Sequence, residues 1–282
     1  MSSIRFNSLL SMRLICARST IGSIRRSSSR SPSSSVWLQR QQNDPFVRQR
    51  QTSQSFVSRS AFKLLELHDK LDLIKPGTSI VDLGAAPGGW IQAADEVLRG
   101  TGTIVGVDLL PLKLSKIAAN TQRIGFVKGD FLEPRTQANL RKTLMKITGQ
   151  ADPQVDLVLS DMMANTSGSS LRDSALSLTL CESALSFALQ HLSPAPPSSS
   201  RTQLVVKHFT SHHTKEFTER LKKYFEVVRW IKPESSRKES REGFLVCGGL
   251  RPREEWPVEE ARADTSRKET KGAGAEEDSL YF

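Results

Sequence analysis

Four ionisable side chains could be brought together by a fold, since three of them flank apolar runs that read as strands and the fourth lies on a predicted helix ahead of the first strand. Two are lysines and two are acids: Lys63, Asp161, Lys207 and Glu242. A lysine amine acts as a general base only when its pKa falls from about 10.4 toward neutrality, and a second cation nearby pushes it in that direction. Carboxylates would hold and orient the two lysines. These residue types therefore indicate a site that takes a proton from a substrate.

Each of these residues also has an ordinary explanation. Lys63 could be a surface lysine whose stem packs along a helix, and Glu242, within RKESREG, could be a solvated charge. Lys207 is harder to explain by packing, because it is a cation that follows the apolar run QLVV.

A second group of residues suits a nucleoside cofactor. Small residues follow the first predicted strand, in VDLGAAPGGW, and let the backbone approach a ligand closely. The next two predicted strands lead to Asp108 and Asp130, and a carboxylate at such a position can hydrogen-bond ribose hydroxyls. The loop lacks the G-x-G-x-x-G spacing that receives a pyrophosphate, so an adenosyl cofactor without phosphates fits better than a dinucleotide. The alternative, a glycine-rich turn that binds nothing, does not explain the two acids.

These residues depend on a regular alternation of strands and helices. We expect strands at 79–83, 103–107, 125–128, 155–160, 203–208, 226–230 and 243–247. We expect helices at 90–98, 112–120, 137–148, 171–190 and 214–224, and one that carries Lys63 ahead of the first strand. This order predicts an α/β fold with a mostly parallel seven-stranded sheet and helices on both faces. Residues 36–253 are expected to form the domain, with 193–202 as a Pro/Ser surface loop.

The net charge of this 282-residue chain is +10, but it is unevenly distributed. Residues 1–60 carry ten arginines and one acid, whereas residues 61–250 carry +4 and residues 251–282 carry −3. A basic chain often binds nucleic acid. Here most of the basicity precedes the predicted domain, so it says little about what the domain binds.

The N-terminal segment has the composition of an import signal. Residues 1–35 contain six arginines, many serines and no Asp, Glu or Lys, which is typical of a mitochondrial transit peptide. The alternative is a disordered RNA-binding arm. We expect residues 1–35 to be a disordered transit peptide that directs the protein to the mitochondrial matrix. Residues 254–282 are charged and poor in apolar side chains, so we expect a disordered tail.

Several classes of protein are not expected. The cysteines are too far apart for a disulfide framework or a Cys-rich zinc module, and the clustered histidines lack matching ligands, so no metal is expected. No run of about 18 apolar residues exists, so membrane insertion is not expected either. The cysteines are Cys16, Cys181 and Cys247, of which the last two fit a core, and the histidines are His208, His212 and His213.

Taken together, the motifs resemble the FtsJ/RrmJ family of S-adenosylmethionine-dependent RNA ribose 2′-O-methyltransferases. The resemblance rests on DLGAAPGGW, GVDLLP, GDF and LSDMMANTSG, and extends from WLQRQQNDPFV to KPESSRKESREGFLV. It implies a Rossmann-like S-adenosylmethionine-dependent methyltransferase fold with S-adenosyl-L-methionine as cofactor. With the transit-like leader, it implies a monomeric enzyme that methylates a uridine in rRNA of the mitochondrial large ribosomal subunit.

The resemblance also assigns roles to residues. It makes Lys207 the base, with Lys63 and Glu242 positioning it and the target ribose, and Asp161 between cofactor and substrate. The implied cofactor contacts are Gly84, Pro87, Gly88, Gly89, Trp90, Asp108, Asp130 and Asp161. The family usually has Pro where Ala164 stands after Asp161-Met162-Met163, and this difference is expected to loosen the loop.

Two basic clusters are candidates for RNA contacts, and the fold could bring them together. The first is Arg48, Arg50, Arg59 and Lys63, and the second is Lys232, Arg237, Lys238 and Arg241. Two rival functions stay open. One is a tRNA ribose methyltransferase of the same family, and the other is a ribosome-assembly factor that binds rRNA and does not need catalysis.

Overall fold

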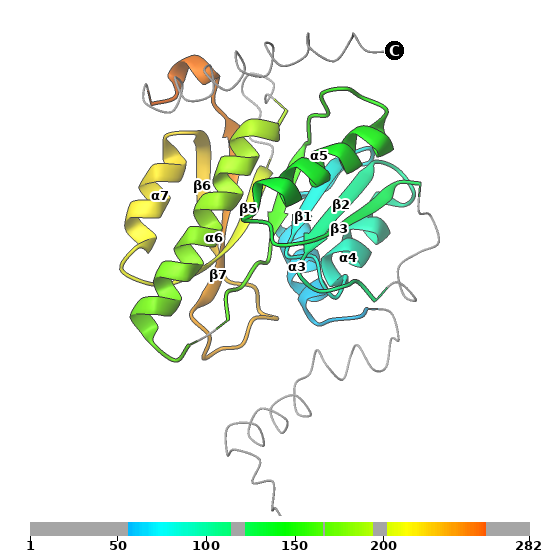
Figure 1. Cartoon of the computed structure of the whole chain (residues 1–282). Coiled ribbons are helices and arrows are strands. Elements are labelled where there is room, and N and C mark those ends of the chain that lie inside the picture. The colour runs from blue at the N-terminus through cyan, green and yellow to red at the C-terminus, as the bar shows by residue number, and fades with distance from the viewer. Residues whose placement is uncertain (1–55, 114–121, 166, 194–201, 258–282) are drawn as a thin grey trace, which may run out of the picture. The chain divides into compact units, whose positions relative to one another are not determined.

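Short apolar runs form the strands of one seven-stranded sheet, and the segments between them form helices (Figure 1). The computed structural model describes residues 56–113, 122–165, 167–193 and 202–257. The strands are β1 (Ser79–Leu83), β2 (Thr103–Asp108), β3 (Ile124–Lys128), β4 (Leu157–Ser160), β5 (Thr202–Phe209), β6 (Phe225–Ile231) and β7 (Glu242–Leu250). The helices are α3 (Ser60–Leu71), α4 (Gly89–Leu98), α5 (Pro134–Thr148), α6 (Ser170–His191), α7 (Thr214–Lys222) and a 3₁₀ turn, η2 (Arg253–Glu255).

The strand order is β3-β2-β1-β4-β5-β7-β6. The five strands from β3 to β5 pair in parallel. β7 lies between β5 and β6 and is antiparallel to both. The predicted α/β fold with a mostly parallel seven-stranded sheet is therefore confirmed.

Helices cover both faces of the sheet because strand side chains alternate between the two faces. On one face, apolar residues of α3 and α4 pack with Ile80, Leu159 and Val205. On the other face, residues of α5, α6 and α7 pack with the alternate strand positions, such as Val81 and Val158. Figure 1 shows α5, α6 and α7 in front of the sheet, with α4 behind it. Each face thus has its own apolar core.

Local sequence explains where several elements begin and end. α5 begins with Pro134, whose missing N–H costs nothing at the first position of a helix. It ends before Gly149, which takes the left-handed conformation (φ 70°) that a glycine tolerates best.

Four predicted boundaries differ from the structure by two or three residues. α5 begins at Pro134 rather than at residue 137, and β7 ends at Leu250 rather than at residue 247. β4 begins at Leu157 rather than at residue 155, because the Asp156 carboxylate accepts the Ser79 N–H and Val155 forms an isolated bridge with Leu192. α7 ends at Lys222 rather than at residue 224, because Tyr224 turns into the core with its side chain buried.

Some predictions fall wholly or largely outside the described residues. They are the transit peptide at 1–35, most of the helix at 112–120, most of the loop at 193–202 and most of the tail at 254–282. In the described part of the chain, no helix is both long and apolar enough to cross a membrane.

Candidate active site

The strand register brings three of the four predicted ionisable residues to the face of the sheet that α3 covers. Each lies two positions from a strand residue in the α3–α4 core, so its side chain points the same way. Asp161 follows Leu159, Lys207 follows Val205 and Glu242 precedes Phe244 by two residues. Lys63 comes to the same place from the first turn of α3.

Lys207 and Asp161 form one buried pair. Lys207 Nζ lies 3.1 Å from Asp161 Oδ1 and donates a hydrogen bond to the Asp161 backbone oxygen at 2.6 Å. Lys207 is 6% exposed. The two contacts fix the ammonium at the point where β4 ends.

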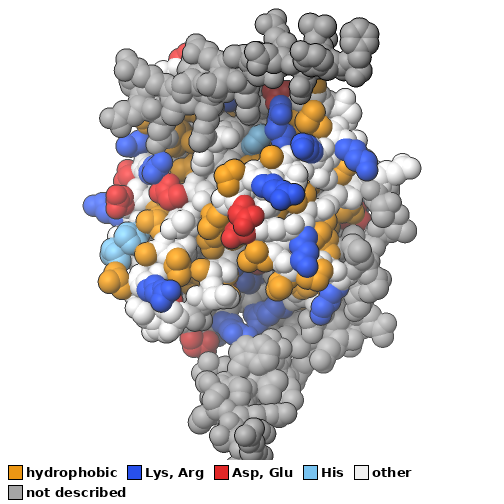
Figure 2. Space-filling model, in the orientation of Figure 1, with side chains coloured by type: hydrophobic (Ala, Val, Ile, Leu, Met, Phe, Trp, Pro, Cys, Tyr) orange, Lys and Arg blue, Asp and Glu red, His pale blue; other side chains and the backbone are white. Residues whose placement is uncertain are grey.

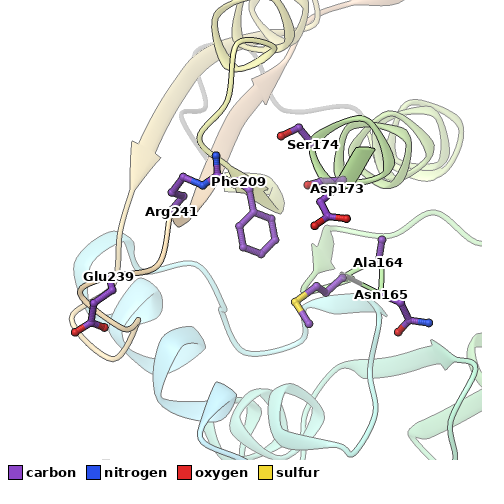
Figure 3. Close-up of a pocket in the computed structure, with 9 residues that line it drawn as sticks. Ala164, Asn165, Asp173, Ser174, Phe209, Glu239 and Arg241 are labelled. Carbon is purple, nitrogen blue, oxygen red and sulfur yellow. The ribbon is translucent and has the colours of Figure 1, made fainter. Parts of the chain in front are cut away.

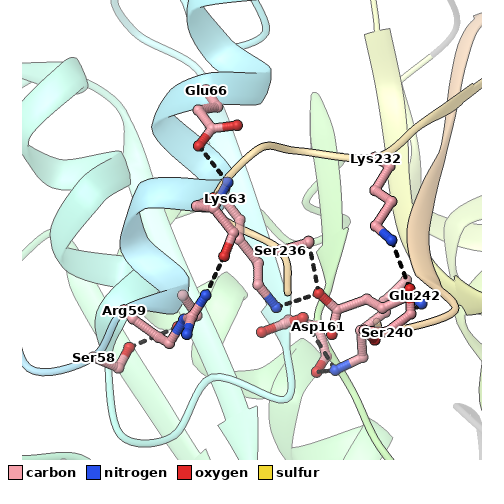
Figure 4. A network of polar contacts seen from close by, with 12 residues as sticks. Ser58, Arg59, Lys63, Glu66, Asp161, Lys232, Ser236, Ser240 and Glu242 are labelled. Carbon is pink, nitrogen blue, oxygen red and sulfur yellow. Dashed lines mark hydrogen bonds and ion pairs between the residues drawn. The ribbon is translucent and has the colours of Figure 1, made fainter. Parts of the chain in front are cut away.

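Lys63 and Glu242 form the second pair (Figure 4). Lys63 Nζ lies 2.5 Å from Glu242 Oε1, which also accepts a hydrogen bond from the Ser236 hydroxyl at 2.9 Å. Burial by itself would raise the pKa of Glu242, but the charge of Lys63, together with Lys207 and the Ser236 hydroxyl, brings that pKa below its ordinary value. Glu242 therefore stays ionised, and the charge of Lys207 links the two pairs into one cluster.

The loop between β6 and β7 is anchored to α3. The Glu66 carboxylate accepts the backbone N–H of Glu234 at 2.6 Å and that of Ser235 at 2.9 Å, and Arg59 donates to the Ser235 carbonyl. Glu66 and Ser236 were missed from the sequence. The available signal was the spacing of Glu66, three residues after Lys63 and so on the same face of the helix.

A cavity of about 240 Å³ opens beside the second pair, and we call it the Lys63 cavity. Its lining includes Arg59, Lys63, Arg237, Phe209 and Glu242. Arg59 and Lys63 of the first predicted basic cluster and Arg237 of the second line this one cavity, so the two clusters meet here. Burial and the charge of Arg237 lower the pKa of Arg59. Two guanidiniums this close favour an anionic ligand. Basic side chains gather around the hollow in the lower part of Figure 2. Arg48 and Arg50 lie outside the described residues.

The predicted cofactor site forms a second cavity, of about 110 Å³, at the ends of β1, β2 and β3. We call it the Asp108 cavity, and its lining includes Gly84, Asp108, Asp130, Met162 and Met163. Gly84 has a φ of +85°, and a Cβ there would lie 2.9 Å from the Met162 backbone. Glycine is therefore required for the chain to pass this close.

The two acids of the Asp108 cavity suit an adenosyl group. Asp108 accepts the N–H of Ala86 at 2.9 Å and that of Leu110 at 2.8 Å, one on each oxygen. Each carboxylate oxygen can accept a further bond, such as one from a ribose hydroxyl. Among the described residues that line this cavity, none is Lys or Arg. The polar groups of this cavity therefore fit a nucleoside cofactor without phosphates.

The other predicted cofactor residues shape the loop and the start of α4. Gly88 takes a φ of 113° immediately before the helix, and the Ala86–Pro87 peptide is cis. A side chain at Gly89 would collide with Ser58. Trp90 is buried, and its indole N–H donates to the Ser60 carbonyl at 2.8 Å. Its ring belongs to the core between α3 and α4, and Trp90 is not among the described residues that line the Asp108 cavity.

Asp82, in the middle of the apolar run SIVDL, was also missed. It is 1% exposed, and neither of its carboxylate oxygens has a hydrogen-bond partner among the described residues. Burial, followed by the charges of Asp161 and Asp108, raises its pKa well above the ordinary value. Burial thus favours the neutral form of the Asp82 carboxyl, which lies next to the site.

His208 points to the opposite face of the sheet and is fully buried. Its Nε2 lies 2.9 Å from the Thr214 hydroxyl, and its Nδ1 lies 3.7 Å from Cys181 Sγ. Thr214 Oγ1 accepts the Ser211 N–H, and Cys181 donates to the Lys207 carbonyl, so one neutral tautomer, protonated at Nδ1, satisfies both contacts.

Among the described residues, no group of three His, Cys, Asp or Glu side chains is placed to hold a metal ion. The rings of His212 and His213 lie against each other, with centroids 3.8 Å apart. Cys181 and Cys247 are buried free thiols, which confirms that both belong to the core.

Comparison with known proteins places this geometry in context. A family model described as FtsJ-like methyltransferase matches residues 56–250. A protein from Acidiphilium cryptum named ribosomal RNA large subunit methyltransferase E is 42% identical over 240 residues, which cover 83% of this chain and 97% of the relative. A protein of the same name from Pseudomonas fluorescens is 36% identical over 226 residues, covering 80% and 99%. The crystal structure of a ribosomal RNA methyltransferase from Plasmodium falciparum superposes with a TM-score of 0.56 at 26% identity, covering 68% of this chain and 97% of that one.

Proposed function

Because the chain belongs to the FtsJ-like methyltransferase family, we propose that it transfers a methyl group from S-adenosylmethionine to a ribose 2′-hydroxyl of large-subunit ribosomal RNA. One observation carries this proposal. Two lysine–carboxylate pairs, each with a buried lysine, share a sheet edge with a cavity suited to a nucleoside cofactor. Met163 lines both that cavity and the Lys63 cavity, so a donor in one and an acceptor in the other would meet beside it.

The cluster suits removal of a proton from a hydroxyl. S-adenosylmethionine, when bound, supplies a methyl group that is already activated on a sulfonium. Lys207 Nζ takes up the hydroxyl proton, and the resulting ammonium is the state that Asp161 pairs with in the structure. Lys63 and Glu242 hold the ribose in line, since preorganised contacts lower the entropic cost of the step. No metal is required for this chemistry.

The target and the compartment are part of the proposal. We propose that the substrate is a uridine of mitochondrial large-subunit rRNA, that residues 1–35 direct the protein to the mitochondrial matrix, and that it acts there as a monomer in the assembly of the mitochondrial ribosome. The support is the relatives' printed names for the RNA and the acid-free, arginine-rich leader for the compartment.

The test is to supply labelled S-adenosylmethionine and mitochondrial large-subunit RNA, or particles from cells that lack the protein, and to map ribose methylation. Methylation by the wild type, lost in Lys207→Ala, is the expected result. Methylation that Lys207→Ala leaves unchanged would sink the mechanism. Transfer to tRNA instead would favour the tRNA rival, and normal ribosome assembly with Lys207→Ala would favour the assembly factor.

A separate experiment tests the compartment. A fluorescent protein fused to residues 1–35 should enter mitochondria, whereas the same fusion with its six arginines replaced by glutamine should not. A wild-type fusion that stays in the cytosol would remove the localisation proposal and leave the proposed reaction standing.

A further inference from the structure

A third cavity, of about 190 Å³, lies between the start of α6 and the end of β5, and we call it the Asp173 cavity (Figure 3). It shares Met163 and Phe209 with the Lys63 cavity, so the two are neighbours. Its volume is far above the roughly 10–15 Å³ that one water needs and below the range for drug-sized ligands, about 300–1,000 Å³. The space suits a single ring system.

Met163 lines all three cavities. It is 60% exposed, although it is a large apolar side chain. If the cofactor occupies the Asp108 cavity and the target ribose the Lys63 cavity, the next group along the nucleotide reaches the Asp173 cavity. The chemistry of its walls decides what that group is.

The walls combine an aromatic ring and a thioether with polar side chains, which are Asn165, Asp173, Ser174, Ser177, Glu239 and Arg241. Phe209 from β5 and Asp173 from α6 reach toward the same space in Figure 3. Unstacked nucleobases are commonly held against aromatic side chains. Ala164, where the family usually has Pro, lines the same cavity.

Hydrogen bonds from neighbouring residues hold the Asp173 carboxylate in place as a hydrogen-bond acceptor. Its Oδ1 accepts both the N–H and the hydroxyl of Ser167, at 2.8 and 2.7 Å, whereas Oδ2 accepts only the Gly168 N–H at 3.3 Å. These bonds, those of Ser167 above all, lower the pKa of Asp173. An ionised carboxylate accepts hydrogen bonds and cannot donate them, and Oδ2 has capacity to spare.

We propose that the Asp173 cavity receives the base of the methylated nucleotide and that Asp173 selects uracil over cytosine. This inference rests on the proposed function. Uracil presents its N3–H to the carboxylate, whereas cytosine in the same position presents N3, so two acceptors would face each other. The N4 amine of cytosine would meet the carboxylate only if the base shifted within the cavity. A site that holds the base in the uracil position therefore disfavours cytosine.

The experiment measures kcat/KM for ribose methylation on two transcripts that differ only by U or C at the mapped nucleotide. The wild type should prefer U by at least about tenfold, since a hydrogen bond to a charged group is at stake. Asp173→Asn, whose amide can donate to the cytosine ring nitrogen, should reduce or reverse this preference. Phe209→Ala should raise KM on both transcripts and keep the preference.

Ser167→Ala is the matched control, because it removes one bond to Asp173 Oδ1 and leaves the carboxylate in place. It should keep the wild-type preference. Equal rates of the wild type on U and C, or a wild-type preference in Asp173→Asn, would overturn the inference while the proposed function stands. If no RNA is methylated, the proposed function fails, and the affinities of the wild type and Asp173→Asn for U- and C-containing oligonucleotides then decide the inference by the same comparison.

Discussion

Lys207 and His208 are consecutive residues of β5 that point to opposite faces of the sheet, and both are buried. Lys207 is paired with a carboxylate, and its charge acts on Glu242, which lines a cavity. Among the residues that the structure describes, the hydrogen-bond partners of His208 are neutral, Thr214 and Cys181, and its ring packs against Phe217. Burial and hydrogen bonding are common to the two residues, so neither property by itself marks a functional group. Charged partners and a neighbouring cavity distinguish the Lys207 side.

The largest expected effect concerns Lys207. Lys207→Met keeps the apolar stem and removes the amine, so the rate of methyl transfer should fall by roughly 10²–10⁴-fold, the usual contribution of a general base. Single-turnover measurement with saturating RNA isolates this step. Lys128→Met, which changes an exposed lysine at the end of β3, is the control and should stay near the wild-type rate. Equal losses in both variants would contradict the role of Lys207.

The next effect is on stability and concerns the opposite face. His208→Ala removes a fully buried ring and its contacts with Thr214 and Cys181, so the free energy of unfolding should fall by about 2–4 kcal/mol. Urea unfolding measures this loss. The methylation rate of the folded variant should change far less than that of Lys207→Met. A variant with unchanged stability and a lost rate would mean that the histidine face belongs to the site.

The free energy of unfolding should depend on pH through His208, on the face of the sheet opposite to Lys207. Burial, followed by the charge of His213, lowers the pKa of His208 from 6.5 to about 4. The unfolded chain therefore takes up a proton on this residue below about pH 6.5 while the folded chain does not, so the free energy of unfolding should fall between pH 6.5 and pH 4. Thermal unfolding across this range should show a shallower dependence for His208→Gln. Identical slopes would show that His208 is not held neutral.

The smallest expected effect is on stability and concerns Ala164, in the loop that follows β4. Ala164→Pro restores the residue usual in the family and restricts the unfolded chain, so it should stabilise the protein by about 0.4–1 kcal/mol if the native backbone accepts proline. Calorimetry measures the shift, with Ala164→Gly as the control that should shift it the opposite way. Destabilisation by Ala164→Pro would show that the loop has a backbone conformation that excludes proline.

The sequence predicts the strands well because apolar runs are local features. It also predicts that Asp161, Lys207 and Glu242 point to one face, since the period of two along a strand fixes side-chain direction, whereas Lys63 reaches them from α3. It does not predict the anchor of Glu66 on Glu234 and Ser235, because 168 residues separate Glu66 from the first of them. The sequence also does not predict that the Trp90 ring is buried, since this depends on the packing between α3 and α4. The roles of the site residues stay predictions until the rates are measured.

The antiparallel direction of β7 determines which of its residues lies next to the candidate site. In the parallel part of the sheet every strand begins at the edge remote from the candidate site, so such a strand contributes residues near its end or just after it, as Lys207 and Asp161 show. β7 runs the other way, and its first residue, Glu242, pairs with Phe209 at the end of β5. Because β7 is antiparallel, its first residue, Glu242, and the basic loop between β6 and β7 both lie at the edge of the sheet where the parallel strands end. Were β7 parallel, Glu242 would lie a full strand length away from Lys63.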